Sequence, residues 1–130
     1  MATVNNPYAP GVRAGRPGMA GALWLVQALS GILLVALLAL HMIAHHFVVE
    51  GGLRDYEQVL DYIASPVIFL LEIVFLVVVT AHAMLGVRAI LLDLGPGPGA
   101  RRAIDIAVTV FGVVAAGYGI WLAVALQGLV

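Results

Sequence analysis

The sequence predicts an all-α integral membrane protein with three transmembrane helices, over about residues 20–47, 66–92 and 103–127. Of its 130 residues, 63% are hydrophobic and only 10% are charged, whereas about a quarter of the residues in a soluble domain carry charge. Each apolar stretch exceeds the roughly 20 residues that a helix needs to cross a bilayer. The chain has no cysteine and a net charge of −1. Disulfides and thiolate metal sites are thereby excluded, and nothing indicates nucleic-acid binding.

Residues 1–19 are predicted to form an N-terminal arm without regular structure. Asparagine, proline and glycine recur there, and these residues favour turns over helices and strands. Contact with a partner protein and a simple tail are both open for this arm. Residues 20–130 are predicted to form one transmembrane domain.

The first predicted helix, residues 20–47, contains no Asp, Glu, Lys or Arg. Trp24 lies near its start, where a ring with one polar edge suits the boundary between lipid and water. Ala28 and Gly31 offer a face of small residues, against which a second helix can pack closely.

Residues 48–65 form the longest polar loop and carry four acids and one arginine, a net charge of −3. Apolar residues recur in this loop at three- and four-residue spacing, which predicts a short amphipathic helix at the membrane surface. Ser65 and Pro66 then predict the start of the second transmembrane helix, because serine favours the cap and proline the first turn.

The second and third transmembrane helices are separated by a run of alternating glycine and proline, residues 95–99, which predicts a turn. Glu72 is an acid within the second helix. Small residues repeat along one face of the third, and they would let another helix approach closely. These residues are Gly112, Ala116, Gly119 and Ala123.

The distribution of arginine predicts the topology. Arginines precede the first helix and flank the turn between the second and third helices. Because positive residues favour the cytoplasmic side, we expect the N-terminus and this turn in the cytoplasm, and the acidic loop outside. The expected location is the cell inner (plasma) membrane. Polar groups within three helices predict a larger bundle, completed by a second membrane subunit.

His82 lies within the second helix, roughly 9 Å inside the boundary that Arg88 would mark at 1.5 Å per residue. Ionisable groups within membrane helices point to function, and neutral imidazole is an axial ligand of haem iron. Gly86 follows one turn later and would leave room for a flat macrocycle. Arg88 would meet a haem propionate or an acidic partner surface. A histidine that only bonds to a neighbouring helix is the alternative.

His41 and His45 lie four residues apart near the outer end of the first helix, so they point the same way, whereas His46 turns off that face. His41 is the deeper of the pair and the better candidate ligand, and His45 would then support the ligand or contact a propionate. By helical rise, His41 and His82 are roughly 15 Å apart along the membrane normal. They cannot share one iron, so either one is not a ligand or two haems are bound. Glu72, at the depth of His41, is a proton-path candidate or a structural acid.

The pattern His82-x-x-x-Gly86-Val87-Arg88, followed by Asp93-x-Gly95, closely resembles the second-helix motif of the membrane anchor (cytochrome b) subunits of succinate dehydrogenase, the succinate:quinone oxidoreductase. The resemblance implies that His82 is an axial ligand of haem b. It also implies an iron–sulfur subunit and a flavoprotein subunit at the cytoplasmic face, and quinone bound between subunits.

The segment around His41 resembles the first helix of di-haem relatives. That resemblance implies the class with two anchor subunits, in which two haems b per complex are shared with the partner anchor.

Two departures from the family leave its quinone site open. Where C-type anchors carry His-Arg-x-Ser-Gly, this chain has Gln27-Ala28-Leu29-Ser30-Gly31, and where D-type anchors have Asp-Tyr it has Asp93-Leu94. Ser30 and Asp93 remain quinone-site candidates. Menaquinone and ubiquinone, and the C and D types, all stay possible.

The predicted function is a haem b-binding anchor that passes electrons from the iron–sulfur subunit to membrane quinone and performs no bond chemistry on succinate. Two alternatives remain: a cytochrome b anchor of another respiratory complex, and a membrane scaffold or transporter subunit without a cofactor. The first would lack the Arg88 and Asp93 that follow the histidine. The second would leave the histidines with structural roles only.

Overall fold

The computed structural model describes residues 17–49, 51–52 and 54–129. They form helix α1 (Pro17–Met42), a π-helical segment η1 (Ile43–Phe47), and helices α2 (Tyr56–Ala64), α3 (Pro66–Asp93) and α4 (Pro98–Gln127). These described ranges contain no strand. Three helices are long and apolar enough to cross a membrane, which confirms the predicted all-α transmembrane fold. Most of the predicted N-terminal arm, residues 1–16, lies outside the described residues.

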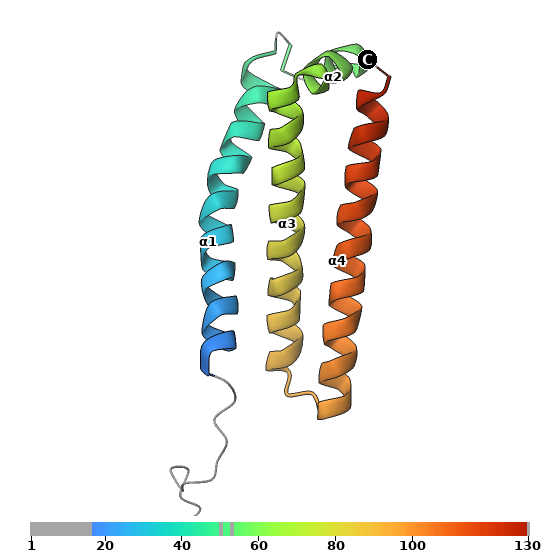
Figure 1. The fold of residues 1–130 in the computed structure, drawn as a ribbon. Coiled ribbons are helices and arrows are strands. Elements are labelled where there is room, and N and C mark those ends of the chain that lie inside the picture. Colours follow the sequence, from blue (N-terminus) through green and yellow to red (C-terminus); the bar gives the residue numbers. More distant parts are fainter. Residues whose placement is uncertain (1–16, 50, 53, 130) are drawn as a thin grey trace, which may run out of the picture.

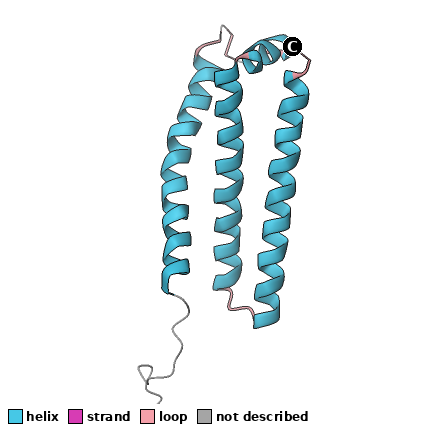
Figure 2. Cartoon of the chain, viewed as in Figure 1, coloured by secondary structure: helices cyan, strands magenta, loops and turns pink. Residues whose placement is uncertain are grey.

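The three long helices stand side by side in a row, with α3 between α1 and α4 (Figure 1). Helix α3 contacts both neighbours, and α2 lies across one end of the row in contact with α3 and α4. The start of α1 and the short connection from α3 to α4 lie at the opposite end (Figure 2). The described part of the acidic loop therefore lies at one end of the row, and Arg88, Arg101 and Arg102 lie toward the other end.

Two helices begin earlier than predicted. Helix α1 begins at Pro17, and α4 begins at Pro98, five residues before the predicted start. Gly95 adopts a positive φ of 70° and makes the turn, and Pro98 occupies the first turn of α4. Arg101 and Arg102, which precede the predicted start, lie inside the helix, and Arg101 Nε donates to the carbonyl of Pro96 just before it at 2.9 Å. Helix α4 thus extends beyond its apolar stretch.

The predicted amphipathic helix in the outer loop is present as α2. Asp55 caps it: its side chain accepts from the Gln58 backbone N–H, and the Gln58 side chain accepts from the Asp55 backbone N–H. This reciprocal capping satisfies two backbone donors at the helix start. Ser65 and Pro66 begin α3 as predicted.

The last turn of the first span is a π-helix, which the sequence did not predict. Val48 N donates to Ile43 O at 3.2 Å, five residues back. The Ala44 carbonyl, which Val48 would bond in an α-helix, instead accepts from Arg54 Nη2 at 3.1 Å. A π-helical turn often marks a functional site, and this one contains His45 and His46.

Glycines set the distance between the helices. A Cβ at Gly112 would lie 2.9 Å from Met84 Cγ, and one at Gly119 would lie 2.7 Å from Leu76 Cδ2. The predicted stripe of small residues on α4 is therefore the face on which α3 packs.

A row of three helices buries very little by itself. Among the described residues only Leu37 is a buried hydrophobic side chain, at 6% exposure. The apolar surfaces on both sides of the row must be covered by lipid or by other membrane helices.

Candidate functional site

His82 lies on α3 and points toward α1. Its Nδ1 is 2.9 Å from Ser30 Oγ, and its Nε2 is 3.4 Å from Gln27 Nε2. Ser30 Oγ also donates to the Gln27 carbonyl at 3.1 Å. We call His82, Gln27 and Ser30 the inner cluster. Each of its side chains is partly buried, and none carries a formal charge when the imidazole is neutral.

Two glycines make room for the inner cluster. A Cβ at Gly31 would lie 3.2 Å from His82 Cε1, so glycine there admits the imidazole ring. A Cβ at Gly86 would lie 3.4 Å from Gln27 Nε2. In this structure Gly86 therefore faces the Gln27 amide, and its role beside a macrocycle stays a prediction.

Arg88 is paired within the chain. Its Nε donates to Asp105 Oδ1 at 2.7 Å, which joins the end of α3 to the start of α4. Arg88 shows neither predicted contact, with a propionate or with a partner surface, because the chain is described alone. Asp93, the last residue of α3, is exposed. It lies apart from the inner cluster, eleven residues along the helix from His82.

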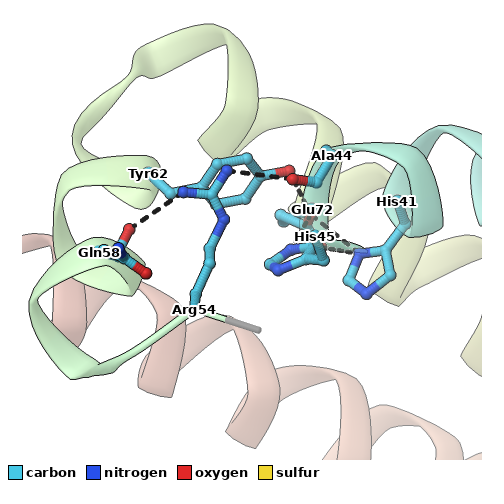
Figure 3. A network of polar contacts seen from close by, with 7 residues as sticks. All are labelled: His41, Ala44, His45, Arg54, Gln58, Tyr62 and Glu72. Carbon is cyan, nitrogen blue, oxygen red and sulfur yellow. Dashed lines mark hydrogen bonds and ion pairs between the residues drawn. The ribbon is translucent and has the colours of Figure 1, made fainter. Parts of the chain in front are cut away.

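A second set of polar side chains gathers at the C-terminal end of the first span, the end that the predicted topology places outside (Figure 3). His41 Nδ1 lies 3.1 and 3.2 Å from the two carboxylate oxygens of Glu72, and His45 Nε2 lies 3.5 Å from Glu72 Oε1. The two imidazole rings are 4.3 Å apart, centroid to centroid. We call His41, His45 and Glu72 the outer cluster.

The outer loop closes over this cluster (Figure 3). Tyr62, on α2, donates its hydroxyl to Glu72 Oε1 at 3.2 Å, and the Arg54 guanidinium lies 4.2 Å from the centre of the Tyr62 ring. Burial raises the pKa of the Tyr62 phenol, and the charge and hydrogen bond of Glu72 raise it further. The phenol therefore stays protonated and donates.

The outer cluster has the composition of a metal site. His41, His45 and Glu72 offer one ligand atom each, all within 4.8 Å of one another. His46 is turned away, as predicted: it is exposed, and its Nδ1 lies 3.1 Å from the Gly52 carbonyl. Of the three outer histidines, His46 alone is left out of the cluster.

Helical rise gives the distance between the two clusters. Glu72 and His82 are ten residues apart on α3, which corresponds to about 15 Å at 1.5 Å per residue. His41 contacts Glu72 directly, so the structure keeps His41 and His82 in different clusters.

The sequence did not single out three residues for chemistry that the structure places in or beside these clusters: Gln27, Tyr62 and Arg54. Gln27 did carry a signal, because it is the one amide in the apolar stretch 20–47, and a strongly polar group is costly within lipid. Tyr62 and Arg54 lie in an ordinary polar loop, and only the fold brings them to Glu72.

Residues 2–120 match the family described as the succinate dehydrogenase/fumarate reductase transmembrane subunit. A succinate dehydrogenase hydrophobic membrane anchor subunit from Archaeoglobus fulgidus is 33% identical over 99 residues, which cover 76% of this chain and 84% of the relative. These matches confirm the resemblance indicated by the motif around His82. The chain belongs to the family of succinate dehydrogenase and fumarate reductase transmembrane subunits.

Proposed function

We propose that this chain is a haem b-binding anchor subunit of a succinate:quinone oxidoreductase, and that it passes electrons from the iron–sulfur subunit toward membrane quinone. The family membership and the three membrane-spanning helices support the anchoring role. The observation that carries the haem proposal is the surroundings of His82: it lies within a membrane helix, and its two ring nitrogens contact the uncharged side chains of Gln27 and Ser30.

The polar groups around His82 fit an axial ligand. Among the described residues, the polar group nearest to His82 Nε2 is the uncharged Gln27 amide, at 3.4 Å. This contact is long, and Gln27 Oε1 is buried without a hydrogen-bond partner among the described residues. The Gln27 amide is thus weakly held, and moving it would expose the nitrogen that an iron needs at small cost.

A haem b supplies one-electron chemistry when it is bound. The residues of this chain would hold and tune it: His82 would ligate through Nε2, and α1 would orient the imidazole. Arg88, six residues beyond His82 on α3, is a basic residue available for a propionate, in exchange for part of its pairing with Asp105.

His41 is proposed as the ligand of a second haem near the outer surface. With Glu72 as a carboxylate, which only accepts, His41 Nδ1 would donate to it, and Nε2 of a neutral His41 would be left as the ligating nitrogen. In His45 the nitrogen directed at Glu72 is Nε2 itself. This difference favours His41 over His45, with His45 as a supporting contact. The other axial ligands would come from the second anchor subunit.

The remaining partners follow from this function. We expect the iron–sulfur and flavoprotein subunits at the end of the row where α1 starts, with the N-terminus in the cytoplasm of a cell whose plasma membrane holds the complex. Ser30 and Asp93 are the quinone-site candidates, for either menaquinone or ubiquinone.

The test is the haem b content of the purified complex, measured as the reduced pyridine haemochrome. We expect two haems b per complex in the wild type and the loss of one in His82→Ala. His46→Ala is the matched control and should keep both. If the wild-type complex holds one haem b and His82→Ala loses it, the inner site is supported and the proposed outer haem is rejected. An unchanged haem content in His82→Ala would overturn the proposal.

A further inference from the structure

Ser30 contacts the ring nitrogen of His82 that would lie away from a bound iron. Ser30 Oγ is 2.9 Å from His82 Nδ1 and 3.1 Å from the Gln27 carbonyl, three residues back on the same helix, to which the hydroxyl can donate. A neutral imidazole that ligates iron through Nε2 carries its proton on Nδ1. In the ligating state, Ser30 Oγ therefore accepts from His82 Nδ1–H, while its own hydrogen can be donated to the Gln27 carbonyl.

The Gln27 amide lies at the other ring nitrogen, 3.4 Å from His82 Nε2. Ser30 is the closer of the two partners, and its Oγ also contacts the carbonyl of Gln27 on its own helix.

From this geometry we propose that Ser30 is a positioning residue for the inner haem: it accepts the His82 Nδ1–H, directs Nε2 at the iron and sets the donor strength of the ligand. The inference rests on the proposed function, in which His82 is an axial ligand. It gives Ser30 a role different from quinone binding, because its Oγ would accept from His82 Nδ1–H.

The proposal predicts the direction of a potential shift. An acceptor on the distant nitrogen of a ligating histidine makes the imidazole more basic, which favours ferric iron. Ser30→Ala removes the acceptor, so the midpoint potential of the inner haem should rise. Ser30→Thr keeps a hydroxyl that can still bond to a backbone carbonyl one turn back, and it should keep the potential close to the wild-type value.

The experiment is a redox titration of the haems in the intact purified complex, together with their electron paramagnetic resonance spectra and the KM for quinone. Wild type, Ser30→Ala, Ser30→Thr and His82→Ala are compared. Thr109→Val serves as the control, because Thr109 is a hydroxyl residue of a membrane helix that lines the groove between α3 and α4. We expect a raised potential and changed g-values in Ser30→Ala only, with haem content and quinone KM unchanged.

The outcomes separate this inference from the proposed function. If His82→Ala keeps every haem, the proposed function fails. If His82 is required but Ser30→Ala leaves the potential and spectrum unchanged, the role of Ser30 is overturned. A raised KM for quinone without a potential shift would also overturn it and return Ser30 to the quinone site. Loss of the haem in Ser30→Ala but not in Ser30→Thr would support the proposal, and loss in both would contradict it.

Discussion

The inner and outer histidines of this chain are held by partners of opposite character. His82 contacts a hydroxyl and an amide, both from α1 and both uncharged. His41 contacts a carboxylate that also receives a hydroxyl from the outer loop. The inner cluster needs only two membrane helices, whereas the outer cluster also needs α2 and the segment before it.

This difference has an electronic consequence for bound iron. A carboxylate on the distant nitrogen draws the proton of a ligating imidazole more strongly than a serine hydroxyl does, and the ligand becomes more basic. If both histidines ligate haem, the outer haem should have the lower midpoint potential. The comparison thus predicts an order of potentials within one subunit.

The largest expected effect that separates the two clusters is loss of the outer haem. His41→Ala should remove one haem b per complex and leave the inner haem, because the ligating nitrogen itself is deleted. Pyridine haemochrome content and the optical spectrum of the reduced complex measure this loss.

His45→Ala is the matched control, since His45 belongs to the same cluster and lies 4.3 Å away, ring to ring. It should retain both haems. If His45→Ala removes the outer haem and His41→Ala does not, the assignment of the pair is reversed.

The next effect is a shift of the outer potential in Glu72→Gln. The substitution keeps the shape and one acceptor but removes the charge, so the His41 imidazole becomes less basic and the potential of the outer haem should rise. A redox titration separates the midpoint potential of the outer haem from that of the inner haem, which should not change.

Glu57→Gln, on the exposed face of α2, is the control. A change in the midpoint potential of the inner haem instead would mean that Glu72 acts on the other haem and that the assignment of clusters to haems is wrong. A proton path through Glu72 stays a prediction of the sequence.

The fold was largely predictable because hydropathy and length decide it. Three apolar stretches in a chain with 10% charged residues leave little choice for the backbone, since helices satisfy their own hydrogen bonds in lipid. The start of α4 at Pro98 was not predicted, because charge marks the lipid boundary but does not end a helix. The π-helix at Ile43–Phe47 was not predicted either. The carbonyl of Ala44 is satisfied by Arg54, a tertiary contact with no local signal.

The candidate site was predictable only in part, for a similar reason. His41, His82 and Glu72 stand out because ionisable groups are rare within apolar stretches. Their partners depend on how each helix is rotated about its axis, which an apolar sequence specifies weakly. The pairing of Arg88 with Asp105, on the neighbouring helix α4, is an example that was not predicted.

A smaller effect tests the inner cluster alone. Gly31→Ala would place a Cβ 3.2 Å from His82 Cε1, so the ring must shift by a few tenths of an ångström. We expect the inner haem to be retained with altered g-values, while the outer haem is unchanged.

Gly21→Ala, on the same helix with nothing within 4 Å of the added Cβ, is the matched control. Alanine is favoured over glycine in a helix by about 1 kcal/mol at either position, so the comparison isolates the contact. Identical spectra for both variants would show that His82 is not held tightly against Gly31.

The smallest expected effect is a change in the potential of the outer haem when its cluster loses one hydrogen bond. Tyr62→Phe removes the hydroxyl that donates to Glu72 Oε1, so the carboxylate has more acceptor strength left for His41. The outer potential should fall slightly, in the opposite direction to its rise in Glu72→Gln, and the inner potential should stay constant. Tyr56→Phe, an exposed tyrosine on the same helix, controls for loss of a phenol. Because the expected shift is small, both variants belong in one titration series with the wild type. A rise in Tyr62→Phe would mean that the hydroxyl stabilises the basic form of the ligand in another way, and that the charge of Glu72 alone does not set the order of the two haems.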